Sequence, residues 1–443
     1  MRTPVSDFIE RYAKSGISRF HMPGHKGKSL LGIEKYDITE IDGADVLSTA
    51  EGIIGESEKN LTSLYGSGKS FYITEGSTTA ICAMLAMIKK TDGEKTHILA
   101  ARNVHKAFVH GIALLDIEAD WLMPKESNGI LSCRVEKSEV EALLSSSDGK
   151  YSAVYLTSPD YLGQMADIKG ISEVCHKYGI PLLVDNAHGA YLKFLDESIH
   201  PIDLGADICC DSAHKTLPVL TGGAYLHISD KAKEFIDTAR EKIALFSSTS
   251  PSYLIMKSMD ICNRYLSESF RKELAKTVER VNAIKSFLSE KGFEVYESEP
   301  LKIVINAAKS GYSGKELSEM MRCAKMEAEF SDDDYLVLMI SPKNTKRDFS
   351  RLKKFFGKTE IKAEIKRDFK PLPYPVREMS VREATFKKSE VTKTKDATGK
   401  ICASVTVSCP PAVPVVISGE RITKEVAEAL LYYGIDEIKT VIG

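Results

Sequence analysis

The sequence predicts an α/β fold built on a mostly parallel sheet covered by helices. Between about residues 60 and 230, short β-branched and apolar runs alternate with helical stretches, the pattern of strand–helix–strand units. The stretch 168–178 is one such helix, joining two strands at the usual spacing. A chain of 443 residues is also too long for one compact core and indicates two or three domains.

Strands and linkers can be placed along the chain from the same patterns. The strands expected in the sheet are 70–74, 153–156, 181–184, 207–210 and 224–227. After about residue 245 a polar, proline-broken stretch leads into a long helix that reaches Lys291. Further expectations are strands at 301–306 and 335–340, a linker at 371–375 and a final amphipathic helix from about 422. The chain is therefore divided into an arm (1–35), a large domain (36–245), a small α+β domain (246–357) and a C-terminal domain (358–443).

Composition excludes several classes of function. The formal net charge of -2 gives no field that would attract nucleic acid or an anionic membrane. The nine cysteines are scattered without a Cys-x-x-Cys pair, which gives little support for a metal site and fits a reducing cytosol. No apolar run approaches the length of a membrane span. A cytoplasmic protein of enzyme size is expected.

The segment Thr74-Glu-Gly-Ser-Thr-Thr-Ala80 is a candidate phosphate-binding turn. It lies where a strand ends and an apolar helix, 81–88, begins. Gly76 lets the backbone approach a ligand closely, and the hydroxyls of Ser77 and Thr78 add to the free amides of the helix N-terminus. Taken alone the signal is weak, because serine and threonine are also ordinary helix N-caps.

Asp185 and Lys215 each end a predicted buried strand. A buried carboxylate needs a partner, and a protonated pyridine nitrogen would be one; metal ligation or helix capping are the alternatives. A lysine in such a place is unusual, and its loss of hydration would lower its pKa and favour Schiff-base chemistry. The neighbouring Ser212 and His214 could bind an anion. For Lys215 taken alone, a solvated surface lysine is the favoured alternative.

The three segments follow the order phosphate-binding turn, acid, lysine, which resembles fold-type I pyridoxal-phosphate enzymes. The lysine follows the acid by 30 residues (215 minus 185), and the turn precedes the acid by roughly 110. The resemblance implies a large domain with a mostly parallel seven-stranded sheet, smaller α+β C-terminal domains, and pyridoxal 5′-phosphate as cofactor.

Further motifs resemble the Orn/Lys/Arg decarboxylase family, the bacterial group III pyridoxal-phosphate decarboxylases. They cover nearly the whole chain: Phe20-His-Met-Pro-Gly-His-Lys-Gly27, Asp37-Ile-Thr-Glu40, Arg102-Asn-Val-His-Lys106, Thr157-Ser-Pro-Asp-Tyr-Leu-Gly163, Val184-Asp-Asn-Ala-His-Gly189, Ser212-Ala-His-Lys-Thr-Leu-Pro218, Pro410-Pro-Ala-Val-Pro414 and Ser418-Gly-Glu420. The resemblance is to short-form members that lack an N-terminal flavodoxin-like domain. It identifies 36–245 as the cofactor-binding domain and 358–443 as the family's C-terminal domain.

The resemblance also implies a role for each site residue. The expected catalytic residues are Lys215 as the Schiff-base lysine, Asp185 at the pyridine nitrogen and His105 stacked on the ring. The expected cofactor-binding set adds Ala187 on the opposite ring face, His188, and the phosphate-binding residues Gly76, Ser77, Thr78, Ser212 and His214. No metal is expected.

A few positions depart from the family or stay open. Glu75 stands where the family usually has asparagine, Cys409 replaces an aromatic residue and Ala412 a glycine, which leaves the substrate open. The acid run Glu329-Phe-Ser-Asp-Asp-Asp334 could bind a substrate's distal cation, although a solvated turn is slightly favoured. Among the other histidines, His97, His176 and His200 are expected at the surface or as caps, while His21 and His25 belong to the arm.

The function implied by the resemblance is decarboxylation of arginine, lysine or ornithine to the corresponding polyamine-pathway amine and carbon dioxide. Arginine is preferred, and a homodimer or higher oligomer is expected. A rival is another fold-type I enzyme, an aminotransferase or a lyase, which would need an arginine clamp for the α-carboxylate. A second rival is a catalytically silent pyridoxal-phosphate-binding paralogue with a regulatory role.

Overall fold

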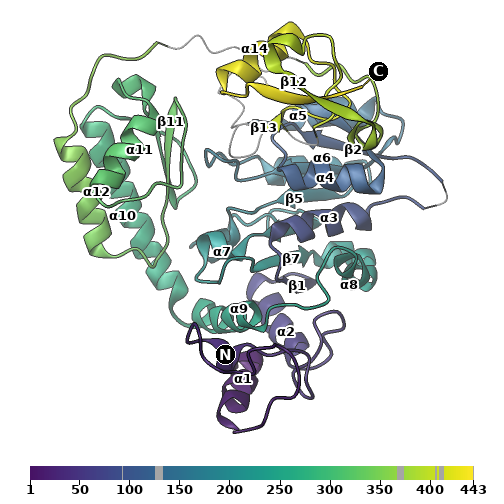
Figure 1. Ribbon diagram of the computed structural model, residues 1–443, viewed down its shortest axis with the longest axis vertical. Coiled ribbons are helices and arrows are strands. Elements are labelled where there is room, and N and C mark those ends of the chain that lie inside the picture. Colours follow the sequence, from purple (N-terminus) through teal and green to yellow (C-terminus); the bar gives the residue numbers. More distant parts are fainter. Residues whose placement is uncertain (92, 125–132, 367–373, 405–406, 409–413, 443) are drawn as a thin grey trace.

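A seven-stranded sheet forms the centre of the larger part of the molecule in the computed structural model (Figure 1). The structure describes residues 1–91, 93–124, 133–366, 374–404, 407–408 and 414–442. The strands are β1 (Lys69–Ile73), β2 (Thr96–Ala101), β3 (Ile117–Leu122), β4 (Tyr151–Thr157), β5 (Leu182–Asp185), β6 (Ile208–Asp211) and β7 (Ala224–Ile228). Their order is β1-β7-β6-β5-β4-β2-β3, and only the pairs that include β7 are antiparallel. The predicted mostly parallel seven-stranded sheet is confirmed.

Helices cover both faces of this sheet, which is why its inner strands are apolar throughout. One face carries α3 (Ser77–Met87), α4 (Lys106–Leu115) and α8 (Ile236–Ala244). The other carries α5 (Lys137–Ser145) and α6 (Ile168–Lys177) toward β2, and α1 (Pro4–Lys14), α2 (Ile53–Tyr65) and α9 (Tyr253–Tyr265) toward β1. The five expected strands are confirmed within one or two residues, while β2 and β3 were not among the expected strands.

A second, antiparallel sheet follows in the chain and stands beside the first, drawn in green (Figure 1). Its order is β10-β11-β9-β8, with β8 (Glu294–Tyr296), β9 (Lys302–Asn306), β10 (Phe330–Ser331) and β11 (Tyr335–Met339). The helices α10 (Arg271–Glu290), α11 (Gly314–Cys323) and α12 (Lys346–Lys358) pack on it. The expected long helix up to Lys291 is present as α9 and α10, joined through one π-helical turn at Leu266–Phe270.

The C-terminal region returns to the large sheet, near α4 and β2 (Figure 1). It contains α13 (Val381–Phe386), α14 (Lys424–Tyr432), and two antiparallel pairs, β12 (Ser389–Lys393) with β15 (Glu437–Val441) and β13 (Val407–Ser408) with β14 (Pro414–Val416). The expected final helix is confirmed as α14. Most of the expected linker at 371–375, together with Cys409 and Ala412, lies outside the described residues.

No helix in the described part of the chain combines the length and the apolar character that crossing a membrane requires.

Candidate active site

The carboxyl ends of β5 and β6 bring Asp185 and Lys215 to the same edge of the large sheet. Asp185 is the last residue of β5 and pairs in register with Cys210 of β6. Lys215 lies just beyond β6 in α7 (Ala213–Thr216), where its peptide N–H donates to the carbonyl of Ser212 at 3.0 Å. Open α/β sheets bind their ligands at this edge.

Asp185 is a buried carboxylate that makes no ion pair with any described residue. It is 2% exposed, and its Oδ1 accepts from the peptide N–H of Ala187 (3.1 Å) and the thiol of Cys210 (3.7 Å). Burial raises the pKa of the Asp185 carboxyl, and the ammonium of Lys215 opposes that rise. These donors leave the carboxylate short of positive charge, so a protonated pyridine nitrogen fits beside it.

Lys215 contacts one side of the His188 ring, and a second lysine, Lys302, contacts the other side. Its Nζ contacts Nε2 of His188 at 3.1 Å, and Nδ1 of the same ring contacts Nζ of Lys302 at 3.4 Å. Burial lowers the pKa of Lys215, and the carboxylate of Asp185 opposes this effect. A lysine in these surroundings is a better nucleophile than one in water. The contacts of Lys215 are therefore not those of a solvated surface lysine, the alternative favoured for this residue alone.

His105 is the N-cap of α4 and faces Lys215. Its Nδ1 accepts the peptide N–H of Ala107 at 3.2 Å, so the neutral ring carries its proton on Nε2. Burial lowers the pKa of His105 to about 4, and the ammonium of Lys215 contributes. A flat, neutral imidazole at pH 7 suits stacking on an aromatic cofactor.

The candidate phosphate-binding turn lies between β1 and α3, and α3 begins at Ser77, four residues before the expected start of the helix. Gly76 precedes α3 with φ of 78°, a backbone conformation that favours glycine, and a Cβ added there would meet no atom within 4 Å. Its peptide N–H donates to the carbonyl of Gly222 at 2.7 Å. Ser212 Oγ donates to Ser77 Oγ at 2.8 Å, so hydroxyls from two distant segments meet at the start of α3. Open space, hydroxyls and the amides of a helix N-terminus fit a phosphate.

Two further expected phosphate ligands border the same turn. Thr78 is exposed in the first turn of α3. His214 is partly buried, and its ring donates through Nδ1 to the carbonyl of Gly223 at 2.9 Å, which leaves Nε2 free of that bond. Glu75, the departure from the family, accepts from Thr74 Oγ1 (2.8 Å) and from the peptide N–H of Ser248 (3.3 Å). Its carboxylate therefore ties the turn to the segment before α9.

The second sheet contributes residues to the site that the sequence did not single out. Lys302 is the first residue of β9. It is fully buried between the apolar core residues Leu301 and Ile303, which is unusual for a lysine. The feature of the sequence that could have pointed to Lys302 is a single lysine at the start of an otherwise apolar strand. Tyr161, in the loop after β4, turns the edge of its ring to His188 with 5.5 Å between ring centroids. Both residues line the side of the site that faces the second sheet.

The acid run divides between two roles. Glu329 is close enough to Lys215 to oppose the lowering of the lysine's pKa, and the hydroxyl of Tyr161 donates to Glu329 Oε1 at 3.5 Å. Asp332 instead accepts the peptide N–H groups of Asp334 and Tyr335, which makes it part of the turn between β10 and β11. The expected turn is therefore present, but Asp332 is buried in it rather than solvated, while the charge of Glu329 acts on Lys215.

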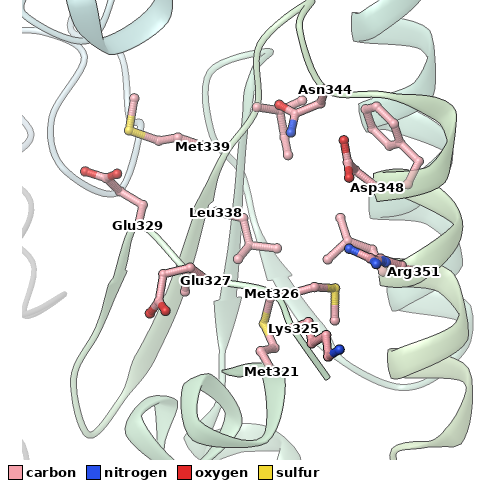
Figure 2. Close-up of a pocket in the computed structure, with 14 residues that line it drawn as sticks. Met321, Lys325, Met326, Glu327, Glu329, Leu338, Met339, Asn344, Asp348 and Arg351 are labelled. Atoms are coloured by element: carbon pink, nitrogen blue, oxygen red, sulfur yellow. The ribbon is translucent and has the colours of Figure 1, made fainter. Parts of the chain in front are cut away.

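A separate pocket of about 430 Å³ lies between β11, α12 and the segment after α11. Figure 2 shows the residues that line it. Glu329 lies on its rim, across the pocket from Arg351 of α12 (Figure 2). Its other labelled residues include Met321, Met326 and Leu338. This pocket does not include Lys215 or Asp185.

A buried network of hydrogen bonds is centred on Asp211, the last residue of β6. Asp211 accepts from Asn186 Nδ2 (2.6 Å), His200 Nε2 (3.1 Å) and His227 Nε2 (3.3 Å). The expectation of a surface position was wrong for His200, which is fully buried because the buried Asp211 carboxylate requires donors. Its Nδ1 accepts the peptide N–H of Ile202 at 3.4 Å, so Nε2 carries the proton. The network thereby fixes Asn186, next to Asp185.

Of the two arm histidines, His21 contacts the arm itself and His25 contacts Asp37, just beyond it. His21 Nε2 lies 2.7 Å from the hydroxyl of Tyr12, and His25 Nε2 lies 3.2 Å from Asp37 Oδ2. Of the two other histidines expected at the surface, His176 is exposed and contacts Asp207, while His97 is partly buried.

Comparisons with known proteins cover nearly the whole chain. The family description "Orn/Lys/Arg decarboxylase, major domain" matches residues 3–328, and "Orn/Lys/Arg decarboxylase, C-terminal domain" matches residues 363–437. The uncharacterized protein YaaO of Bacillus subtilis is 31% identical over 462 residues, covering 97% of this chain and 94% of that protein. An arginine decarboxylase of Bacillus subtilis is 27% identical, covering 96% of this chain and 92% of that protein.

Two solved structures share the fold. The lysine decarboxylase of Francisella novicida matches with a TM-score of 0.83 at 18% identity, covering 99% of this chain and 81% of that one. The constitutive lysine decarboxylase of E. coli matches with a TM-score of 0.80 at 17% identity, covering 100% and 82%.

Proposed function

The chain belongs to the Orn/Lys/Arg decarboxylase family, and from this premise we propose that it decarboxylates arginine at the site built around Lys215 and Asp185. As a member it is a pyridoxal-phosphate-dependent decarboxylase of basic amino acids. One observation carries the assignment of the site: the unpaired, buried carboxylate of Asp185 lies at the same sheet edge as the buried amine of Lys215.

The described residues suit pyridoxal 5′-phosphate. When bound, it supplies an aldehyde that condenses with amines and a ring that takes up the electron pair left when carbon dioxide departs. Asp185 would hold a proton on the ring nitrogen, and His105 and Ala187 would pack against the two ring faces. The phosphate would be held at the start of α3 by the residues named above: Gly76, Ser77, Thr78, Ser212 and His214.

Lys215 has two tasks in this proposal. Its depressed pKa makes its Nζ an amine that can join the cofactor and then yield it to the substrate. Once free, the same Nζ would take up the proton that the substrate's ammonium gives up, and could return it to the substrate carbon from which carbon dioxide has left. His188, in contact with Nζ, keeps the amine oriented during both tasks.

Arginine is proposed as the substrate for two reasons. Relatives named arginine decarboxylase match 94–96% of this chain at 25–27% identity. Glu329 also offers a carboxylate whose charge acts on Lys215, and a guanidinium binds a carboxylate through two parallel hydrogen bonds. We propose that Glu329 binds the distal group of the substrate, and that the product is the corresponding polyamine-pathway amine.

The rival aminotransferase or lyase would need an arginine for the substrate's α-carboxylate. Among the described residues, the charged groups that act on Lys215 are Asp185, Lys302 and Glu329. Arg102 binds Glu420 through two hydrogen bonds from its terminal nitrogens. Neither observation favours the rival.

One experiment tests the proposal. Full-length protein is mixed with pyridoxal phosphate, reduced with borohydride and digested, and the modified peptide should contain Lys215. Carbon dioxide release is then measured with arginine, lysine and ornithine, and arginine should give the highest kcat/KM. Cofactor attached to another lysine, or a Lys215→Ala protein with unchanged turnover, would end the proposal. Cofactor trapping without carbon dioxide release would favour the silent paralogue.

We also propose that the protein is a cytoplasmic homodimer. The arm carries large apolar side chains in solvent, with Phe20 95%, Leu30 90% and Leu31 83% exposed. Apolar surface of this kind gains free energy when a partner covers it. A monomeric mass by light scattering at micromolar concentration would contradict this part of the proposal.

A further inference from the structure

Lys302 connects the second sheet to the site residues of the first. It is 0% exposed, and its Nζ lies within 3.3–3.4 Å of four groups: the carbonyls of Asp160 and Tyr161, Glu299 Oε1 and His188 Nδ1. Its counter-ion Glu299 is itself buried and accepts the hydroxyl of Tyr191. A lysine held by this many groups has a fixed position and direction.

The chemistry of an ammonium determines how the His188 ring is protonated. A lysine ammonium can only donate hydrogen bonds, so the ring nitrogen that faces Lys302 must accept. That nitrogen is Nδ1 of His188, at 3.4 Å. In the neutral ring the proton then sits on Nε2, the nitrogen that contacts Lys215 Nζ at 3.1 Å. An N–H that points at an amine nitrogen requires the amine to offer its lone pair.

We propose that Lys302 is a positioning residue that fixes His188 as the Nε2–H form, so that His188 donates to Lys215 and holds Lys215 as a neutral amine. The inference rests on the proposed function only in taking Lys215 as the reactive lysine. It gives the second sheet a direct part in preparing that lysine, through the chain Glu299, Lys302, His188, Lys215.

The surrounding charges agree with this assignment. Burial lowers the pKa of His188 well below its usual range, and the ammonium of Lys302 adds to that effect, so the ring is neutral. Burial also lowers the pKa of Lys215, and Lys302 contributes in the same direction. The titratable groups that face Lys215 from the packed elements include His105, Asp185, His188, Cys210, His214, Lys302 and Glu329. Of these, only Lys302 both repels a Lys215 ammonium and fixes the His188 ring.

The test measures the protonation of Lys215 and His188 in full-length protein without added cofactor. Carbamylation of Lys215 by cyanate is followed by mass spectrometry across pH, because only the neutral amine reacts. In Lys302→Met, the repelling charge is lost and His188 can accept from a Lys215 ammonium. The midpoint should therefore rise by about one pH unit, with roughly tenfold slower labelling at neutral pH. Nitrogen-15 NMR of the histidine rings should show the proton of His188 leaving Nε2, with His188→Gln used to assign the signal.

Two further variants separate positioning from structural support. Lys285→Met is the matched control, because Lys285 contacts Ser298 and the carbonyl of Glu299 but not His188. It should leave the Lys215 midpoint unchanged. The double variant Lys302→Met/Glu299→Gln removes both charges of the ion pair and serves if the single variant does not fold. It should still raise the midpoint.

Two results would overturn the inference. In one, a folded Lys302 variant keeps the Lys215 midpoint and the His188 nitrogen signals of the wild type. In the other, the midpoint falls. Neither measurement uses the cofactor, so a failure of the borohydride experiment would remove the proposed function while leaving these results to be judged separately.

Discussion

The guanidinium of Arg102 and the carboxylate of Glu420 form a buried, two-pronged ion pair across 318 residues of chain. The two N–H···O distances are 2.7 and 2.8 Å, and the side chains are 1% and 4% exposed. Arg102 directly follows β2 and also lies 4.9 Å from the ring centroid of Trp121. The pair attaches the C-terminal region to the large sheet. Its Arg102 lies three residues before His105 in the chain.

Removing one partner of this pair should destabilise the protein strongly. Arg102→Met or Glu420→Gln leaves the other charge buried and unpaired, which costs about 3–5 kcal/mol. The double variant should recover much of that loss, because no lone charge remains. Urea unfolding monitored by Trp121 fluorescence measures each free energy of unfolding. Additive losses in the double variant would show that the two residues do not act as a pair.

Asp185→Asn should impair turnover much more than folding. The variant keeps the size of the side chain but removes the negative charge that would hold the cofactor's ring protonated. Loss of one such electrostatic contact typically lowers kcat by about 10²–10³-fold. Cofactor content and thermal stability provide the controls. A variant with normal kcat would show that Asp185 does not face the ring nitrogen.

Cys210→Ala is a gentler change at the same carboxylate. The thiol donates to Asp185 Oδ1 at 3.7 Å, and its removal takes one donor from that oxygen while the peptide N–H of Ala187 stays. We expect the pKa of the carboxyl to rise further and the affinity for pyridoxal phosphate to fall a few-fold. Fluorescence titration with the cofactor measures this. The control Cys209→Ala alters the opposite face of β6, away from Asp185, and should leave the affinity unchanged.

Much of this site could be predicted from the sequence because the end of each strand is marked by a change from apolar to polar residues. Asp185 and Lys215 follow apolar runs, and the Gly76 turn precedes a helix that is apolar all round, so their place at the sheet edge could be predicted. The strands β2 and β3 were not recognised, because Thr96–Ala101 is rich in alanine and Ile117–Leu122 mixes charged and apolar residues.

Contacts between segments that lie far apart in the chain could not be predicted from the sequence. Arg102 and Glu420 each lie in a recognised motif, yet nothing in the chain indicates that the two motifs touch. Likewise, His200 reads as a surface residue until Asp211 is seen to need donors in the interior. Lys302 reads as a lysine at a strand start until the second sheet places it against His188. Tertiary packing decides these roles.

Lower pH should stabilise the protein through Asp260. Its carboxylate accepts the peptide N–H of Ser6 and the hydroxyl of Ser57, but burial raises its pKa from 3.8 to about 6. Between these two values the folded state binds more protons than the unfolded state, so the free energy of unfolding falls as pH rises. From pH 7 to pH 5, Asp260 should add about 1 kcal/mol to stability. Asp260→Asn should lack this increment in urea unfolding at the two pH values, and an equal increment in both proteins would contradict the assignment.

Glu329→Gln should weaken substrate binding selectively. The variant keeps an oxygen that can accept from the hydroxyl of Tyr161 but loses the charge proposed to bind the substrate's distal cation. We expect KM for arginine to rise about tenfold or more, since a charge-assisted hydrogen bond contributes about 1.5–3 kcal/mol, while cofactor binding stays normal. Asp333→Asn is the matched control: it lies in the same acid run but pairs with Lys315 at 3.0 Å, away from the site. Equal effects of the two variants would mean that Glu329 contributes only to the general negative field of this segment and does not contact the substrate.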